Sequence, residues 1–178
     1  MVVVAGDPSS PAVILRRRME LVADARRFAY HAAAAASPAA AEAAIVNAHK
    51  QAQAAARQEI TAALKDLRQK GWMPMAAALP DPREPPGPLE AVLAVHAKLH
   101  AAEGWFYRSA VAQACAAAGL APILIDERRL WRDGATALGI GEDAVRTRVK
   151  RLGEGLGPPW AEDQRLCALM AWLALRRV

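Results

Sequence analysis

Residues 2–22, VVVAGDPSSPAVILRRRMELV, decide the fold, because they can form either two strands or a strand followed by a helix. The opening VVVAG is β-branched or small and runs into the turn-rich DPSSP, which is typical of a strand that ends in a tight turn. After this turn, apolar and charged side chains alternate, which favours a second strand over residues 12–22. A helix capped by Ser10 is the alternative, because several of the same apolar residues also share a helical face. We predict the strand.

The order of the later segments predicts an α/β protein. After residue 22 we expect a turn at 23–26 (ADAR), a strand at 27–31 (RFAYH), a helix at 38–70, a strand at 72–79, a helix at 89–118, a strand at 122–125 (PILI), helices at about 127–138 and 142–152, and a last helix at 161–177. Three strands followed by alternating helices and strands predict a mixed five-stranded sheet. Its first three strands are expected to be antiparallel and its faces covered by helices, in a single domain over residues 1–178.

The helix at 38–70 is the most strongly indicated element. Ser37 is a natural N-cap, Pro38 suits the first helical turn, and Gly71 follows the last turn. One apolar stripe at helical spacing is predicted to be buried: Ile45, Ala52, Ala56, Ile60, Ala63 and Leu67.

Composition excludes some functional classes. The 178 residues suit one domain, and no run of about 18 apolar residues free of charge predicts a membrane span. The N-terminal apolar run precedes its arginines, unlike a signal peptide. Cys115 and Cys167 are expected to be reduced, so we predict a cytoplasmic protein. A net charge of +5 is compatible with nucleic acid as a partner, and equally with a merely arginine-rich surface. No oligomeric state is indicated.

The order of elements resembles the ribonuclease H-like fold, and several segments look like parts of bacterial Holliday-junction resolvases. The segments that carry this likeness are VVVAGDPSSPAVI (2–14) for the first hairpin, EGWFYRSAVAQACAAAGLAPILIDERRL (103–130) for a helix and strand, and ALGIGEDAVRTRVKRL (137–152) with WAEDQRLCALMAWLAL (160–175) for the closing helices. The likeness spans most of the chain and consists of element order and small residues.

The resemblance implies a nuclease that holds two Mg²⁺ or Mn²⁺ ions with acidic side chains beside the scissile phosphate. Carried over to this chain, it gives Asp7 at the first turn and Glu162 or Asp163 at the last helix as catalytic acids. No acid lies in the predicted fourth strand, and Arg165 or Leu166 stands where a further acid is expected. A nuclease-like protein that acts on or near nucleic acid is the first hypothesis. A non-enzymatic interaction or scaffold protein is the alternative.

The stretch 95–108, VHAKLHAAEGWFYR, gathers polar side chains in an alanine-rich chain. The residues that share one helical face there are His96, His100, Glu103 and Tyr107. Two imidazoles and a carboxylate at this spacing can bind a transition metal. They can also form a functional cluster without a metal, or a polar seam between helices.

We expect His100 and Glu103 to be functional residues of this stretch. Gly104 follows directly and is predicted to interrupt the helix, where it lets the chain bend or another backbone approach closely; this could turn Arg108 toward Glu103. Arg108 would then pair with that carboxylate or hold a phosphate. The four side chains from His100 to Arg108 are predicted to form one connected cluster.

The segment 135–153, ATALGIGEDAVRTRVKRLG, looks like a helix-turn-helix. Its second helix begins with Glu142 and Asp143, which would repel a duplex, and its basic residues come later. Acid at the start and base at the end of a helix also suit the helix dipole alone. Arg146 and Lys150, with Arg108, are the predicted nucleic-acid contacts.

Overall fold

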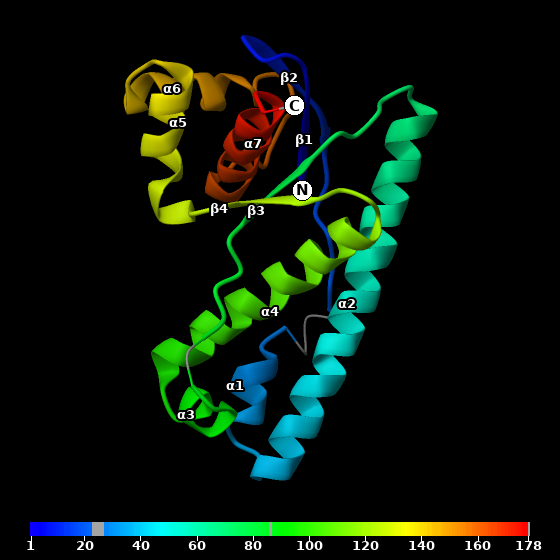
Figure 1. The fold of residues 1–178 in the computed structure, drawn as a ribbon, viewed down its shortest axis with the longest axis vertical. Coiled ribbons are helices and arrows are strands. Elements are labelled where there is room, and N and C mark those ends of the chain that lie inside the picture. The colour runs from blue at the N-terminus through cyan, green and yellow to red at the C-terminus, as the bar shows by residue number, and fades with distance from the viewer. Residues whose placement is uncertain (23–26, 86, 178) are drawn as a thin grey trace. The chain divides into compact units, whose positions relative to one another are not determined.

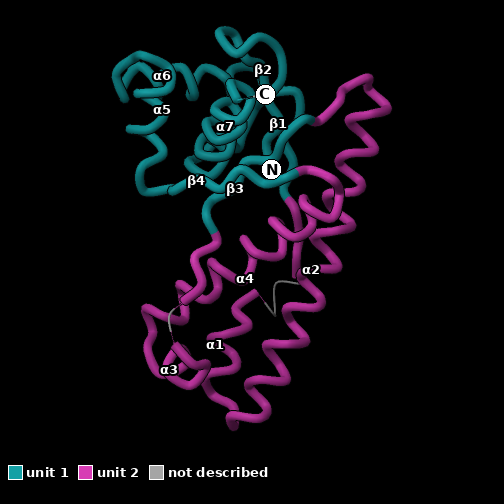
Figure 2. The backbone as a smooth tube through the Cα atoms, in the orientation of Figure 1, with its two compact units in different colours: residues 1–18, 75–81, 121–178 teal, residues 19–74, 82–120 magenta. Residues whose placement is uncertain are grey.

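The structure, a computed structural model, describes residues 1–22, 27–85 and 87–177 and divides into two compact units (Figures 1 and 2). Unit 1 comprises residues 1–18, 75–81 and 121–178, and unit 2 comprises residues 19–74 and 82–120. Each unit is thus assembled from segments that are separated in the sequence. The single domain expected over residues 1–178 stays a prediction.

Unit 1 begins with a β-hairpin. Strand β1 (Val2–Asp7) pairs antiparallel with β2 (Ser10–Arg16). The Asp7 carboxylate closes the turn, because it accepts hydrogen bonds from the Ser9 backbone N–H (2.7 Å) and hydroxyl (2.6 Å). The segment after the turn is therefore a strand rather than a helix, and it ends at Arg16 rather than at residue 22.

The predicted five-stranded mixed sheet is wrong. The described residues contain two separate two-stranded sheets, namely the β1–β2 hairpin and the parallel pair of β3 (Ala77–Pro80) with β4 (Pro122–Ile125). The strand at 122–125 is confirmed. The strand expected at 72–79 begins only at Ala77, since Pro74 cannot donate to a ladder.

The predicted third strand is a helix instead. Residues 27–31 run into α1 (Ala29–Ala33), which lies in unit 2, and the turn expected at 23–26 lies outside the described residues. Three of the five residues of α1 are alanines, which have the highest helix propensity of all residues. Without this strand, no antiparallel meander can form.

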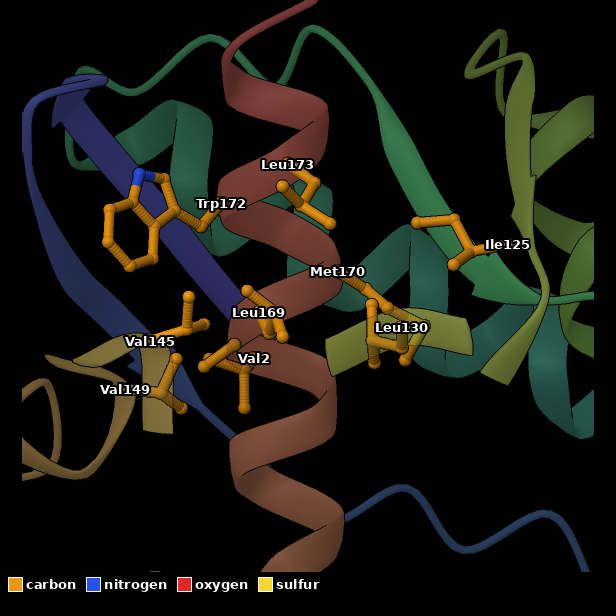
Figure 3. Close-up of a cluster of buried hydrophobic side chains, with 10 residues drawn as sticks. Val2, Ile125, Leu130, Val145, Val149, Leu169, Met170, Trp172 and Leu173 are labelled. Atoms are coloured by element: carbon orange, nitrogen blue, oxygen red, sulfur yellow. The ribbon is translucent and has the colours of Figure 1, made fainter. Parts of the chain in front are cut away.

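The helices of unit 1 surround a core centred on α7 (Figure 3). A 3₁₀ turn at Glu127–Arg129 leads into α5 (Leu130–Leu138), followed by α6 (Glu142–Arg151) and α7 (Glu162–Leu175). Helix α7 packs against β1, β3, α5 and α6. The core side chains drawn in Figure 3 are Val2, Ile125, Leu130, Val145, Val149, Leu169, Met170, Trp172 and Leu173. Both ends of the chain therefore contribute to one core.

Arg16 fastens the hairpin to the loop before α7. Its guanidinium donates to the carbonyl oxygens of Leu156 (3.1 Å), Gly157 (2.8 Å) and Pro158 (3.3 Å), and also to that of Pro159. The planar guanidinium thus supplies several N–H donors to consecutive carbonyl oxygens of a loop, which lie outside helices and strands.

Trp160 follows this loop and lies on the backbone of Gly153. Its indole N–H donates to the Val149 carbonyl at 3.2 Å, and a Cβ at Gly153 would overlap the indole ring. We expect Gly153→Ala to lower the free energy of unfolding of unit 1 by roughly 1–3 kcal/mol, because the ring must leave its site. Denaturant unfolding of the variant measures this.

Gly104→Ala is the control for that substitution. Gly104 lies inside a helix, and a Cβ there would meet nothing within 4 Å. Helix propensity alone then applies, and the variant should gain about 0.8–1 kcal/mol. If both glycine variants change stability in the same direction, the steric role of Gly153 is refuted.

Unit 2 is helical. It contains α1, α2 (Pro38–Gln69), α3 (Leu89–Leu93) and α4 (His96–Ala117), and α4 packs against α1, α2 and α3. Helix α2 confirms the predicted helix at 38–70, and every residue of its predicted apolar stripe is buried. The helix expected at 89–118 is divided at Ala94 and Val95, whereas α4 runs through Gly104. The predicted interruption at Gly104 is therefore wrong, because a helix tolerates the cost of one glycine, about 1 kcal/mol.

The state of the two cysteines and the length of the apolar helices concern both units. Cys115 and Cys167 are free, and burial raises the pKa of both thiols. None of the helices in the described part of the chain combines the length and apolar character that a bilayer crossing needs.

Candidate metal centre

Three histidines of unit 2 come together where α1 meets the first turns of α4. His31 lies on α1, while His96 and His100 lie one turn apart on α4. One ring nitrogen from each lies within 4.8 Å of the other two. The Nε2 atoms of His96 and His100 are 3.0 Å apart. Two imidazoles on a tetrahedral zinc ion, with Zn–N bonds of about 2.0–2.1 Å, place their nitrogens about 3.4 Å apart, so the observed spacing is close to a ligand pair.

The rings of the three histidines also face one another. The centroid of the His31 ring lies 4.7 Å from that of His100 and 5.4 Å from that of His96. His96 and His100 are exposed and His31 is half-buried. A metal ion held by these rings would thus keep one side open to solvent.

Glu103 contacts both the first turn of α1 and one histidine of the cluster. This carboxylate is only 6% exposed, and its Oε1 accepts hydrogen bonds from the backbone N–H groups of Tyr30 (2.8 Å) and His31 (3.2 Å). These N–H groups belong to the first turn of α1, whose N-cap position is Phe28 and offers no side-chain acceptor. Glu103 therefore caps a helix that lies more than 70 residues earlier in the chain.

The same carboxylate fixes the orientation of His31. Nδ1 of His31 lies 3.3 Å from Oε1 of Glu103, a contact in which the tautomer with Nδ1–H would donate to the carboxylate and offer Nε2 to a metal. A carboxylate behind a ligating imidazole is the usual support for such a ligand. Oε2 of Glu103 is buried and finds no hydrogen-bond partner among the described residues. One carboxylate oxygen thus has unused acceptor capacity directly beside the histidines.

Two tyrosines and His49 lie near the Glu103 carboxylate. The Tyr30 hydroxyl lies 3.1 Å from Nε2 of His49, and the Tyr107 hydroxyl donates to the Arg27 carbonyl at 2.6 Å. Burial lowers the pKa of His49. Burial, aided by the negative charge of Glu103, raises the pKa of both Tyr30 and Tyr107 to about 12.

We expect both tyrosines to ionise near pH 12 in the folded protein instead of near pH 10. Tyr30 and Tyr107 are the two tyrosines of the chain, so the ultraviolet absorbance of tyrosinate reports on them alone. Between about pH 10 and 12 the unfolded chain has lost these protons and the folded chain keeps them. The stability they contribute is therefore complete below about pH 10 and declines toward pH 12. A folded-state titration with a midpoint near 10 contradicts this.

The structure places the predicted site residues in two groups. His100 and Glu103 belong to the centre in unit 2, joined through His31 rather than through Arg108. Asp7 and Asp163 belong to unit 1. The remaining predicted residues lie on two helices: Tyr107 and Arg108 on α4, and Arg146 and Lys150 on α6.

His31 is the candidate ligand that the sequence analysis did not include. The prediction of a strand for its segment hid the possibility that it faces the helix of His96 and His100. One signal was available, because the chain has only four histidines and two of them already stand at ligand spacing.

The part of the chain that the structure describes offers no second group of potential metal ligands as compact as these three histidines. Within the described ranges, His31, His96 and His100 form the one group of three or more potential ligand side chains with atoms this close. The Asp7 carboxylate is fully exposed, and its hydrogen bonds from Ser9 lower its pKa. A two-metal nuclease site built on Asp7 and Asp163 stays a prediction.

The likeness to Holliday-junction resolvases likewise stays a prediction. Comparison of the chain with protein-family models, with curated proteins and with solved structures gives no match. The histidine–carboxylate geometry of unit 2 is therefore the basis for assigning a function.

Proposed function

We propose that unit 2 binds a transition-metal ion, with Zn²⁺ as the favoured ion, through His31, His96 and His100. The observation that carries this proposal is the convergence of three imidazoles within 4.8 Å, one of them oriented by the buried Glu103 carboxylate. Neutral imidazole is a ligand of choice for zinc and its neighbours in the first transition row.

The arrangement is of the open type. Structural zinc sites use four protein ligands, whereas catalytic sites use three and leave one position for water or substrate. His96 and His100 are exposed, which leaves that position accessible. Zinc in such a site lowers the pKa of its water to about 7 and so supports hydrolysis. Glu103 is a positioning residue in this scheme, because its carboxylate contacts Nδ1 of His31.

Zinc should bind in a one-to-one ratio and raise the melting temperature of unit 2. At a free zinc concentration about 100 times the dissociation constant, the stabilisation is about 2.7 kcal/mol, or roughly 10 °C or more for a unit of this size. His100→Ala should weaken binding by more than about 100-fold, because loss of a ligand exceeds the usual effect of losing a supporting residue. Isothermal titration calorimetry and thermal melts measure both quantities.

His49→Ala is the matched control, since it removes the fourth histidine of the chain and leaves the three ligands in place. It should keep zinc affinity within a few-fold of the original chain. The Co²⁺-loaded protein should show the visible bands of nitrogen and oxygen ligation, without the intense near-ultraviolet bands of thiolate bound to cobalt. Equal loss in both histidine variants, or thiolate bands from Cys115 or Cys167, would refute the site.

This centre is chemically distinct from the nuclease site that the resemblance implies. Mg²⁺ prefers oxygen ligands in octahedral geometry, which three imidazoles do not offer. A Mg²⁺- or Mn²⁺-dependent cleavage of branched or single-stranded DNA would therefore depend on residues other than His100. A nuclease assay on the His100→Ala variant separates the two activities.

A further inference from the structure

Unit 1 carries a basic pocket formed by α5, α6 and α7. The pocket has a volume of about 180 Å³ and is lined by Trp131, Arg146, Thr147, Lys150, Glu162 and Arg165. Arg146 and Lys150 stand one turn apart on α6 and share the face that lines the pocket. Three cationic side chains and one acidic side chain therefore meet there.

The structure neutralises only one of these cations. Arg165 is engaged on both sides: its Nε and one Nη donate to the Trp160 carbonyl at 3.2 and 3.1 Å, and its other Nη lies 3.7 Å from the Glu162 carboxylate. By contrast, neither Arg146 nor Lys150 has a carboxylate partner among the residues described. Two positive charges thus remain available for an anion in the pocket.

Trp131 holds the guanidinium of Arg146 in position before an anion binds. The guanidinium of Arg146 lies over the indole ring of Trp131, 4.2 Å from its centroid. This cation–π contact holds the guanidinium in one plane and leaves its N–H edge available for the paired oxygens of a phosphate. Trp131 is half-buried, so its ring provides a fixed support.

The charge continues beyond the pocket along the same helix. Arg151 of α6 is exposed and directly follows Lys150, whereas the acidic residues of this helix, Glu142 and Asp143, stand in its first turn. A free anion would use the pocket alone, while a chain of phosphates would also meet the cation at Arg151. The acidic first turn opposes base reading in a groove and favours contact with the sugar–phosphate backbone.

We infer that this pocket binds a backbone phosphate of a nucleic-acid strand, without sequence preference, through Arg146 and Lys150. Arg146 supplies a bidentate contact on the support of Trp131, and Lys150 adds a second charge one turn away. The exposed Arg151 next to Lys150 extends the contact along the strand. Because the pocket lies in unit 1, this binding is independent of the metal centre of unit 2.

The test is fluorescence anisotropy of a labelled oligothymidylate over a range of salt concentrations, with EDTA present to remove bound metal. Arg146→Ala and Lys150→Ala should each weaken binding about tenfold. Each should also reduce the slope of log affinity against log salt by about 0.7, the amount expected for one lost phosphate contact on a single strand. Arg146→Lys keeps the charge and loses the planar contact, and should fall between the original chain and Arg146→Ala.

Arg176→Ala is the matched control, because it removes the same charge from an exposed position of unit 1 at the end of α7. It should change affinity less than about twofold. Circular dichroism should show that all variants remain folded, as expected for exposed side chains. If Arg176→Ala weakens binding as much as Arg146→Ala, or if the original chain does not bind the oligonucleotide, the inference is overturned.

Competition identifies the source of the phosphate. Unlabelled oligothymidylate should displace the probe, whereas inorganic phosphate and polyglutamate at equal charge concentration should not. Displacement by inorganic phosphate would make this a pocket for a free anion. Displacement by polyglutamate would make it a general surface for acidic polymers. Either result overturns the assignment to nucleic acid.

Discussion

Trp172→Ala is expected to lower the free energy of unfolding of unit 1 by about 3–5 kcal/mol, a larger loss than we expect from Gly153→Ala in the same unit. Trp172 is 2% exposed and lies in the core cluster around α7 (Figure 3). Its truncation removes a large apolar surface and leaves a cavity. The indole N–H also donates to the Pro8 carbonyl at 2.8 Å, so the turn of the β-hairpin loses its link to α7. Urea unfolding followed by circular dichroism measures the loss.

Trp172→Phe separates packing from hydrogen bonding. Phenylalanine keeps most of the apolar contact and cannot donate to Pro8, so its cost should be nearer to about 1–2 kcal/mol. If the alanine variant costs no more than the phenylalanine variant, Trp172 does not fill the core as described.

Glu103→Ala should destabilise unit 2 by about 1.5–3 kcal/mol. The carboxylate caps the first turn of α1, and its loss leaves the N–H groups of Tyr30 and His31 without their acceptor. Hydrogen bonds to a charged group are worth about this much, and the penalty of about 1–3 kcal/mol for leaving a buried donor unpaired gives a similar value for the same loss. Denaturant unfolding of the metal-free protein measures the change.

Glu103→Gln distinguishes the cap from the support of a metal ligand. Glutamine keeps one carbonyl oxygen for the N–H groups of α1, so the stability loss should be less than half that of the alanine variant. Zinc affinity should still fall by about 10-fold to 100-fold, since a neutral amide supports His31 more weakly than a carboxylate does. If stability falls equally in both variants while zinc affinity is unchanged in Glu103→Gln, Glu103 does not support the metal ligand.

Local signals in the sequence predicted the elements that local interactions stabilise. Helix α2 was predicted almost to the residue, because Ser37, Pro38 and Gly71 mark its ends and its apolar stripe is continuous. The strand at 122–125 was equally plain from its short apolar run. The choice of a strand after the first turn was also correct, since its alternation matched the hairpin partner.

The errors concern interactions between distant segments. Which strand edges pair is decided by tertiary contacts, so element order alone could not show that the hairpin and the parallel pair form separate sheets. The helix at Ala29–Ala33 depends in part on the Glu103 carboxylate, which no local pattern reveals. The helix is divided at Val95 because this residue adopts an extended backbone conformation at the N-cap of α4. β-Branched residues such as valine favour that conformation.

Local spacing indicated only part of the candidate metal centre. Spacing on one helix identified His100 and Glu103 as a pair worth testing, because face-sharing positions follow from helical geometry. The third ligand, His31, comes from a helix that packs against α4, and this packing is a property of the folded chain.

The core around α7 has a consequence for the order of events during synthesis. Val2 packs in the same core as Leu169 and Trp172, and Arg16 binds carbonyls of residues 156–159. The β1–β2 hairpin can therefore reach its core partners only after α7 has been synthesised. Residues 19–120, which contain all of unit 2, emerge in the meantime and can fold first. Completion of unit 1 requires closing a loop of more than 100 residues, which makes it the slow step of folding.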